Sequence, residues 1–196
     1  MLALARSLSL AALLLSACSS TSFVSSWRPP TARPVNMKGA KVAAVILVNN
    51  PGSRRTAEDT LARKISERGA VGVPLYRLMP NAGPGSEAEV RAELEKQNFK
   101  GVVVMRPLGA KQELNVYAQP SSAHYWGGYY GYGWGTTYEY RADTIVSVDV
   151  RVYSLEQNQL IWAGESKTTN PERVDEFVIE LADAAADEMQ RWGLIQ

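Results

Sequence analysis

Few side chains in this sequence are suited to acid–base or metal chemistry. His124 is the only histidine and Cys18 is the only cysteine. A histidine-rich or thiolate metal site needs several such ligands, and a Ser-His-Asp triad would have to be built around His124 on a glycine-rich segment. Glu113 and Glu139 could in principle serve glycoside cleavage, where the separation of two carboxylates decides the chemistry. We therefore expect no metal, no cofactor and no catalytic residue.

Residues 124–140 are rich in side chains suited to binding a ligand or partner. These 17 residues contain six tyrosines, two tryptophans and five glycines. Glycines add no side chain to a core and cost backbone entropy on ordering, whereas rings with a polar tip suit contact with sugars, protein or a bilayer interface. Mutual packing of the tyrosines at a hairpin end, or disorder, stays open as the alternative. The candidate binding residues, in a loop at 120–142, are Tyr125, Trp126, Tyr129, Tyr130, Tyr132 and Trp134.

A candidate polar cluster falls near the ends of predicted strands, where open α/β sheets place their ligands. Its members are Arg54, Arg55, Glu58 and Arg106, with Asp59 beside them. A structural ion-pair cluster accounts for the same residues, and we favour it. A phosphate-binding glycine loop is not indicated, because the glycines at 127–135 open no helix and no lysine accompanies them.

The amino-terminal segment indicates export and a lipid anchor. Arg6 precedes an apolar run from Leu8 to Leu15, the layout of an export signal and much shorter than the ~20 residues of a spanning helix. Leu15-Ser16-Ala17-Cys18 resembles the lipobox of bacterial lipoproteins. This resemblance implies cleavage of residues 1–17, diacylglycerol on the Cys18 thiol and an acylated amino terminus, for example with palmitate. Ser19, rather than aspartate, then implies the outer membrane, with the domain facing the periplasm.

The mature chain would be one neutral domain on a tether. Removing Arg6 with the signal leaves 21 − 1 = 20 basic against 20 acidic residues, which argues against nucleic acid as a partner, because that would need a clustered basic face. Residues 18–40 are rich in serine and proline and lack apolar periodicity, so we expect a lipidated linker. Trp27 is the exception, and we expect it to dock in a groove of its own domain. Residues 41–196 suit a single domain.

The first half of this domain alternates between strands and helices. Apolar runs predict strands at 41–48, 71–76 and 101–105. Thr56 and Ser86, each with an acidic residue three positions on, predict the starts of the two helices between them. Two consecutive β-α-β units predict parallel neighbouring strands.

The second half has the pattern of antiparallel strands and ends in a long helix. Alternation at 111–119 and 146–153 has the period of two that is typical of antiparallel strands, and another strand is expected at 160–162. Asn170 and Pro171 predict the start of a helix whose apolar stripe runs to Trp192. The predicted fold class is α/β (α+β): a layered mixed β-sheet of about five to six strands with three helices, β-α-β-α-β followed by antiparallel strands and a long C-terminal helix.

Several short motifs extend over most of the mature chain. They are Trp27 before the prolines, Arg54-Arg55 with Glu58-Asp59, Val73-Pro74 with Tyr76, the Gly101 to Val104 strand ending in Arg106, and Tyr153 before Leu160-Ile161-Trp162. On these motifs the sequence resembles a family of uncharacterised bacterial lipoproteins that has no established activity. The order of elements is similar to a mixed-sheet domain in penicillin-binding-protein activators, the curli secretion lipoprotein and the Tol propeller protein. Fold similarity of this kind does not transfer function.

These observations favour a non-enzymatic outer-membrane lipoprotein. We expect it to attach to the membrane through lipid on Cys18 and to bind an envelope protein or glycan through the aromatic loop. The alternative is a subunit of an oligomeric secretion channel, in which residues 111–152 would form a long hairpin. An enzyme acting on cell-wall glycan is the third and weakest hypothesis.

Overall fold

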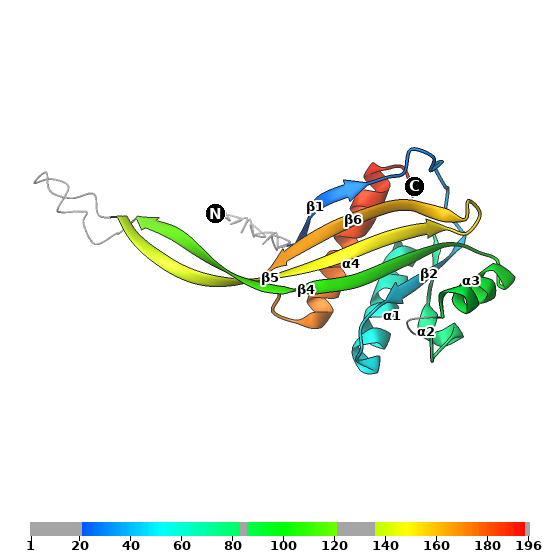
Figure 1. Cartoon of the computed structure of the whole chain (residues 1–196), viewed down its shortest axis with the longest axis horizontal. Coiled ribbons are helices and arrows are strands. Elements are labelled where there is room, and N and C mark those ends of the chain that lie inside the picture. The colour runs from blue at the N-terminus through cyan, green and yellow to red at the C-terminus, as the bar shows by residue number, and fades with distance from the viewer. Residues whose placement is uncertain (1–20, 83–85, 121–135, 195–196) are drawn as a thin grey trace, which may run out of the picture.

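The computed structural model describes residues 21–82, 86–120 and 136–194. This part of the chain forms a six-stranded mixed sheet in the order β1-β6-β5-β4-β2-β3, with four helices (Figure 1). The mixed α+β class and the long C-terminal helix confirm the prediction. The strands are β1 Thr21–Trp27, β2 Lys41–Ile46, β3 Val71–Pro74, β4 Phe99–Pro120, β5 Thr136–Ser154 and β6 Gln159–Thr169; the helices are α1 Pro51–Glu67, α2 Leu75–Leu78, α3 Glu87–Lys96 and α4 Val174–Arg191.

The sheet has a parallel half and an antiparallel half. Strand β2 pairs in parallel with β3 and with β4, as the β-α-β pattern predicts. Strands β4, β5, β6 and β1 pair antiparallel. The alternation predicted for β5 is confirmed, because Val148, Val150 and Val152 are all buried against the helices. The order of the predicted elements therefore agrees with the directions of β2 to β6.

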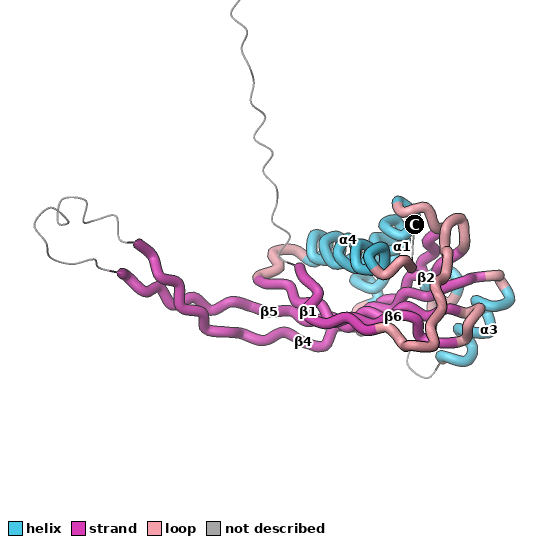
Figure 2. The backbone as a smooth tube through the Cα atoms, turned by 90° about the horizontal axis from the view of Figure 1, so that it is seen from above, coloured by secondary structure: helices cyan, strands magenta, loops and turns pink. Residues whose placement is uncertain are grey.

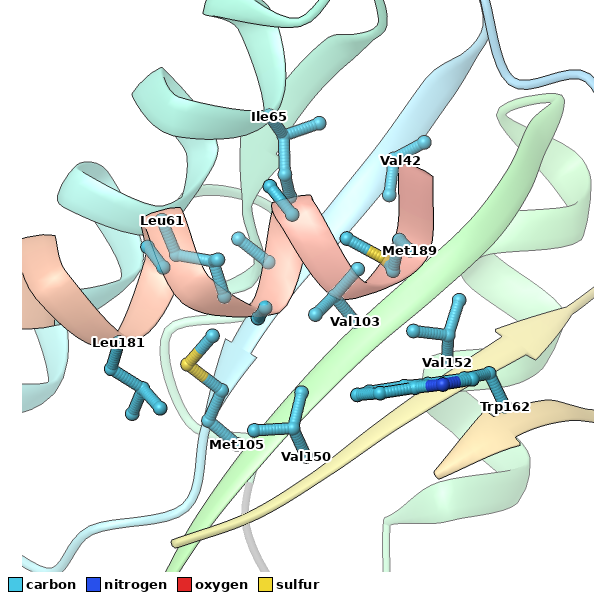
Figure 3. Close-up of a cluster of buried hydrophobic side chains, with 14 of the residues drawn as sticks. Val42, Leu61, Ile65, Val103, Met105, Val150, Val152, Trp162, Leu181 and Met189 are labelled. Carbon is cyan, nitrogen blue, oxygen red and sulfur yellow. The ribbon is translucent and has the colours of Figure 1, made fainter. Parts of the chain in front are cut away.

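Helices cover the sheet unequally. Helices α1 and α4 lie on one face, and α3 lies beyond the other face near the β2–β4 end (Figure 2). The larger core cluster, which includes Trp162, lies under α1 and α4 (Figure 3). Trp162 is 0% exposed, and its ring meets the Phe23 ring edge-on with the centroids 5.4 Å apart. Ala43, Leu94 and Phe99 belong to the smaller cluster on the opposite face. The first cluster fixes the position of α4, whose first turn forms part of the groove described below.

The prediction of a linker over residues 18–40 is wrong for much of that range. Residues 21–27 form β1, an edge strand antiparallel to β6, and Ala32, Val35 and Met37 are buried in the core. A bulge between Phe23 and Ser25 breaks the alternation, so the strand has no period of two to recognise. The prediction that Trp27 docks in a groove is also wrong, because its side chain is 54% exposed at the end of β1.

Several helix boundaries also differ from prediction. Helix α1 begins at Pro51 rather than after Thr56, because the Asn50 side chain accepts a hydrogen bond from the Ser53 amide at 2.9 Å and caps the helix. Asn170 does not cap α4; it has a φ of 48° and its side chain binds Thr144 and Asp143 instead. Helix α2, a single turn, replaces the end of the strand predicted at 71–76, so the helices number four among the described residues.

Strands β4 and β5 continue beyond the sheet as a two-stranded ribbon, which we call the arm. It comprises residues 112–120 and 136–144, in nine pairs from Gln112↔Thr144 to Pro120↔Thr136. At ~3.4 Å per residue this is about 30 Å of ladder, and Figures 1 and 2 show it projecting away from the helices. The predicted loop at 120–142 is therefore too long at its carboxyl end, because strand pairing resumes at Thr136.

Candidate functional site

The predicted lipidation site and binding loop lie outside the described residues. This applies to Cys18, to His124 and to the aromatic candidates Tyr125, Trp126, Tyr129, Tyr130, Tyr132 and Trp134. The structure does describe the two strands that the loop connects. These strands form the arm, whose last pair, Pro120↔Thr136, lies at the end farthest from the core.

The register of the arm separates apolar from polar positions. Successive residues of a strand alternate between its two faces. Positions on one face hold the apolar or aromatic pairs Leu114↔Ala142, Val116↔Tyr140 and Ala118↔Tyr138; the other face holds Glu113↔Asp143, Asn115↔Arg141 and Tyr117↔Glu139. Leu114, on the first face, is 78% exposed. The residue types at these register positions are therefore apolar on one face and polar on the other, and the described side chain of Leu114 leaves the apolar face uncovered at that position.

The arm also has two unpaired edges. Strand β2 ends its pairing with β4 at Met105, and β6 ends its pairing with β5 at Ile145. Within the described structure, residues 112–120 and 136–144 form ladder pairs only with each other, and Asn170 bonds the backbone N–H and C=O of Thr144 at the base of the arm. The outward N–H and C=O groups of such a ribbon can add a strand from a partner. The arm thus offers a partner both an apolar face and backbone hydrogen-bonding groups.

The two carboxylates considered for glycan cleavage both lie on the arm. Glu113 is opposite Asp143, and Glu139 is opposite Tyr117. Four steps of the ladder separate these pairs, which is about 13 Å between backbone positions. Paired glycosidase carboxyl groups lie roughly 5 to 9.5 Å apart, so the register does not itself place the two as a catalytic pair.

Of the predicted polar cluster, Arg54 and Glu58 form the centre. Glu58 is 1% exposed, lies 3.7 Å from the Arg54 guanidinium, and accepts hydrogen bonds from the amides of Ile46 at 3.3 Å and Tyr76 at 2.7 Å. Arg54 in turn donates to the carbonyls of Pro80 and Ala82. These bonds join β2, α1, α2 and the segment after α2. The arrangement organises the fold around a buried carboxylate.

The other predicted members lie around this centre or apart from it. The Arg55 guanidinium lies over the Tyr76 ring, 5.8 Å from its centroid. Asp59 accepts from the Tyr76 hydroxyl and from Arg77 at 2.7 Å. Arg106 is not part of this group; it pairs with Asp149 on β5 at 3.2 Å, and Arg151 shares that carboxylate at 2.9 Å. The charges at both places have partners within the fold, as expected of structural ion pairs.

We expect the stability lost on Glu58→Gln to depend on pH. Burial raises the pKa of Glu58 above its ordinary 4.5, against the opposing effects of the Tyr76 and Ile46 amides and the Arg54 charge. The folded state therefore binds this proton more tightly than the unfolded state, so the contribution of Glu58 is fully present below pH 4.5 and declines as pH rises through the raised pKa. At neutral pH the variant should lose about 1–3 kcal/mol, because an amide cannot accept from both backbone groups.

Denaturant unfolding of both proteins at neutral pH and near pH 5 measures this effect. The deficit of Glu58→Gln should be larger at the lower pH. Glu95→Gln is the matched control, because Glu95 forms an exposed ion pair with Arg91 at 2.8 Å, and exposed pairs contribute less than about 1 kcal/mol. Equal deficits at the two pH values would contradict the assignment of Glu58 as the buried titrating group.

An apolar groove of about 310 Å³ was not predicted from the sequence. It lies between the first turns of α1 and α4, over a floor from β2, β4 and β5. Of its fifteen lining residues only Ser53, Glu172 and Arg173 are polar. Its volume is at the lower end of the ~300–1,000 Å³ range of ligand pockets. Its apolar residues follow ordinary core periodicity, so the groove exists only because the tertiary fold brings them together from two helices and three strands. They include Ile46, Val48, Ala57, Met105, Val146, Val148, Val174, Phe177 and Leu181.

The part of the chain that the structure describes contains neither a metal-binding cluster nor a membrane-spanning helix. No three His, Cys, Asp or Glu side chains there are grouped so that they could hold a metal ion. None of the helices described is both long and apolar enough to cross a bilayer.

Comparison with known proteins shows distant structural similarity only. No protein-family model and no curated protein sequence matches the chain. Among solved structures, the PelC dodecamer from Paraburkholderia phytofirmans aligns with a TM-score of 0.46 at 10% identity, over 83% of this chain and 94% of its own. The lipoprotein GNA1162 from Neisseria meningitidis aligns with a TM-score of 0.41 at 14% identity, over 81% and 99%. These similarities identify neither a family nor a function, and the family resemblance stays a prediction.

Proposed function

We propose that this protein is a lipid-anchored, non-enzymatic component of the cell envelope, held at the outer membrane through Cys18 and facing the periplasm. In this proposal the arm presents the aromatic residues between its strands to an envelope protein or glycan. One observation carries the proposal: the nine-pair ladder from Gln112↔Thr144 to Pro120↔Thr136 extends beyond the core and joins directly to residues 121–135.

The chemistry of the arm supports binding rather than packing within the chain. A two-stranded ribbon is marginal in water unless a third strand or another surface supports it. Here the first apolar position beyond the sheet, Leu114, is 78% exposed. An extended ribbon with an apolar face and an aromatic tip places its recognition groups where a large partner has access to them. The core then serves as the base that holds the arm.

Capture of envelope material by the purified protein tests this function. A variant in which Tyr129, Tyr130, Tyr132 and Trp134 are all alanine should lose at least about 90% of the recovered peptidoglycan or envelope protein, since aromatic anchors contribute ~2 kcal/mol or more each at interfaces. The matched control is Trp192→Ala, an exposed aromatic at the end of α4. A second variant shortens the arm by replacing residues 116–140 with Asn-Gly, which favours a tight hairpin turn.

The outcomes are distinct. Loss of capture in the alanine and short-arm variants, with capture retained by Trp192→Ala, is the expected result. Capture that is unchanged in both variants would overturn binding through the arm. Circular dichroism and a cooperative melt for each variant show that the core remains folded.

A second candidate function, a subunit of an oligomeric secretion channel, is favoured by the length of the arm. Membrane-spanning strands need ~9–11 residues with alternating apolar positions, and the arm has nine pairs with one apolar face. The short-arm variant separates the two functions when its mass is measured in detergent by light scattering. A channel subunit would change from an oligomer to a monomer, whereas a tethered binding protein would keep the oligomeric state of the unmodified chain.

A further inference from the structure

The apolar groove between α1 and α4 has the chemistry of a hydrocarbon site. Val174, at its rim, is 65% exposed although it lines the groove. The one basic lining residue, Arg173, is paired with Asp175 at 2.8 Å and Glu176 at 3.7 Å. Its charge is thus already matched by carboxylates of α4. A groove with these walls selects an uncharged, flexible, apolar ligand over an anion.

The start of β1 lies close to this groove. Thr21 is paired with Thr168 of β6, which is in turn paired with Val146 on the groove floor. The Thr21 hydroxyl contacts the Thr168 hydroxyl at 2.7 Å and donates to Glu180 of α4 at 3.1 Å. Two strand spacings of ~4.8 Å therefore separate Thr21 from Val146.

The lipid expected on Cys18 is within reach of the groove. Three residues lead back from Thr21 to Cys18, and a chain spans at most ~3.3–3.6 Å per residue, or about 10 Å. An acyl chain attached at that point is also at high effective concentration, ~mM for a short tether, relative to any free lipid. An acyl chain in the groove also removes the apolar walls of the groove, including the exposed Val174, from water.

We propose that one acyl chain of the Cys18 lipid lies in the groove between α1 and α4. The proposal rests on the lipid anchor of the proposed function and adds a fixed position for the domain. The remaining acyl chains stay in the bilayer, so the end of the molecule from which the arm starts is held at the membrane surface. The anchor then orients the arm as well as retaining the protein.

Photocrosslinking in intact membranes tests this placement. A benzophenone amino acid replaces Val174, whose exposure allows a large side chain, and reacts with nearby C–H bonds on illumination. The matched control carries the same amino acid at Val24, an exposed position of β1. We expect crosslinks between position 174 and the lipid-bearing Cys18 peptide of the same chain, at least about tenfold more frequent than from position 24. Both positions are within reach of the tether, so this preference would come from the groove that holds the acyl chain.

Mass spectrometry distinguishes each outcome. Crosslinks from position 174 to free phospholipid, to a second copy as a covalent dimer, or to no lipid would each overturn the proposal. The intact mass of the same sample shows whether Cys18 is lipidated. A lipidated chain without the crosslink refutes only the groove, whereas an unmodified Cys18 refutes the anchor of the proposed function together with it.

Discussion

Cys18→Ser should move nearly all of the protein from the membrane fraction to the soluble fraction without unfolding it. Serine lacks the thiolate nucleophile to which diacylglycerol is transferred. Two or more acyl chains anchor a protein stably at ~0.8 kcal/mol per buried methylene, so their loss removes the expected attachment entirely. The core should fold without the lipid, because its described elements begin at Thr21, after the modified residue.

Fractionation and thermal melting of Cys18→Ser measure both parts of this prediction. A contrasting variant begins at Lys38 and lacks β1 together with the buried residues Val35 and Met37. It should lose roughly 5 kcal/mol of stability, since each fully buried apolar side chain contributes ~1.5–3 kcal/mol. A Cys18→Ser protein that stayed with the membrane would refute the lipid anchor. A fully stable chain from Lys38 would refute the role of β1.

Gly72→Ala should destabilise the fold by about 3 kcal/mol or more, the upper range for overpacking a close contact. A Cβ atom at Gly72 in β3 would overlap the Ala62 carbonyl oxygen of α1 and lie 2.7 Å and 2.8 Å from the Ala62 carbonyl carbon and Cα. These are backbone atoms, which cannot rotate away. To make room, β3 would have to leave α1, but its Gly72 amide donates to Ser66 at 3.0 Å and its residues pair with β2.

Denaturant unfolding of Gly72→Ala beside Val71→Ala isolates this contact. Val71 is the adjacent residue of β3 and is exposed, so its truncation should cost less than about 1 kcal/mol, as expected at an exposed surface position. If the two variants were equally stable, α1 and β3 would not approach as closely as the structure has them.

The sequence by itself determined the class of fold and the direction of most strands. Side-chain period depends on local backbone geometry, two residues for a strand and 3.6 for a helix, so the alternation at 146–153 and the stripe of α4 were readable without a structure. The parallel pairing of β2 with β3 and β4 followed from the helices between them. Such features are local in the chain and repeat over many residues.

The sequence indicated the residues of the polar cluster but not their grouping. Arg54 and Glu58 were predicted together because both fall near the end of a predicted strand, and they do pair. The Tyr76 amide that completes the Glu58 site lies 18 residues away. Arg106 was grouped with them because it ends a strand, yet its partner Asp149 comes from the antiparallel neighbour. Contacts between distant segments depend on sheet order, which spacing along the chain does not determine.

Only the tertiary structure decided that residues 21–37 belong to the domain, that the hairpin projects as an arm, and that a groove separates α1 from α4. Strand β1 is recognisable only beside β6, because its pairing and the contact of Phe23 with Trp162 take the place of a periodic apolar pattern. The arm exists because β4 and β5 extend beyond the last residues that pair with their neighbours β2 and β6. The groove arises where α1 and α4 meet over residues of β2, β4 and β5. All three are relations between elements far apart in the chain, and the free energy that sets them comes from packing that no single segment contains.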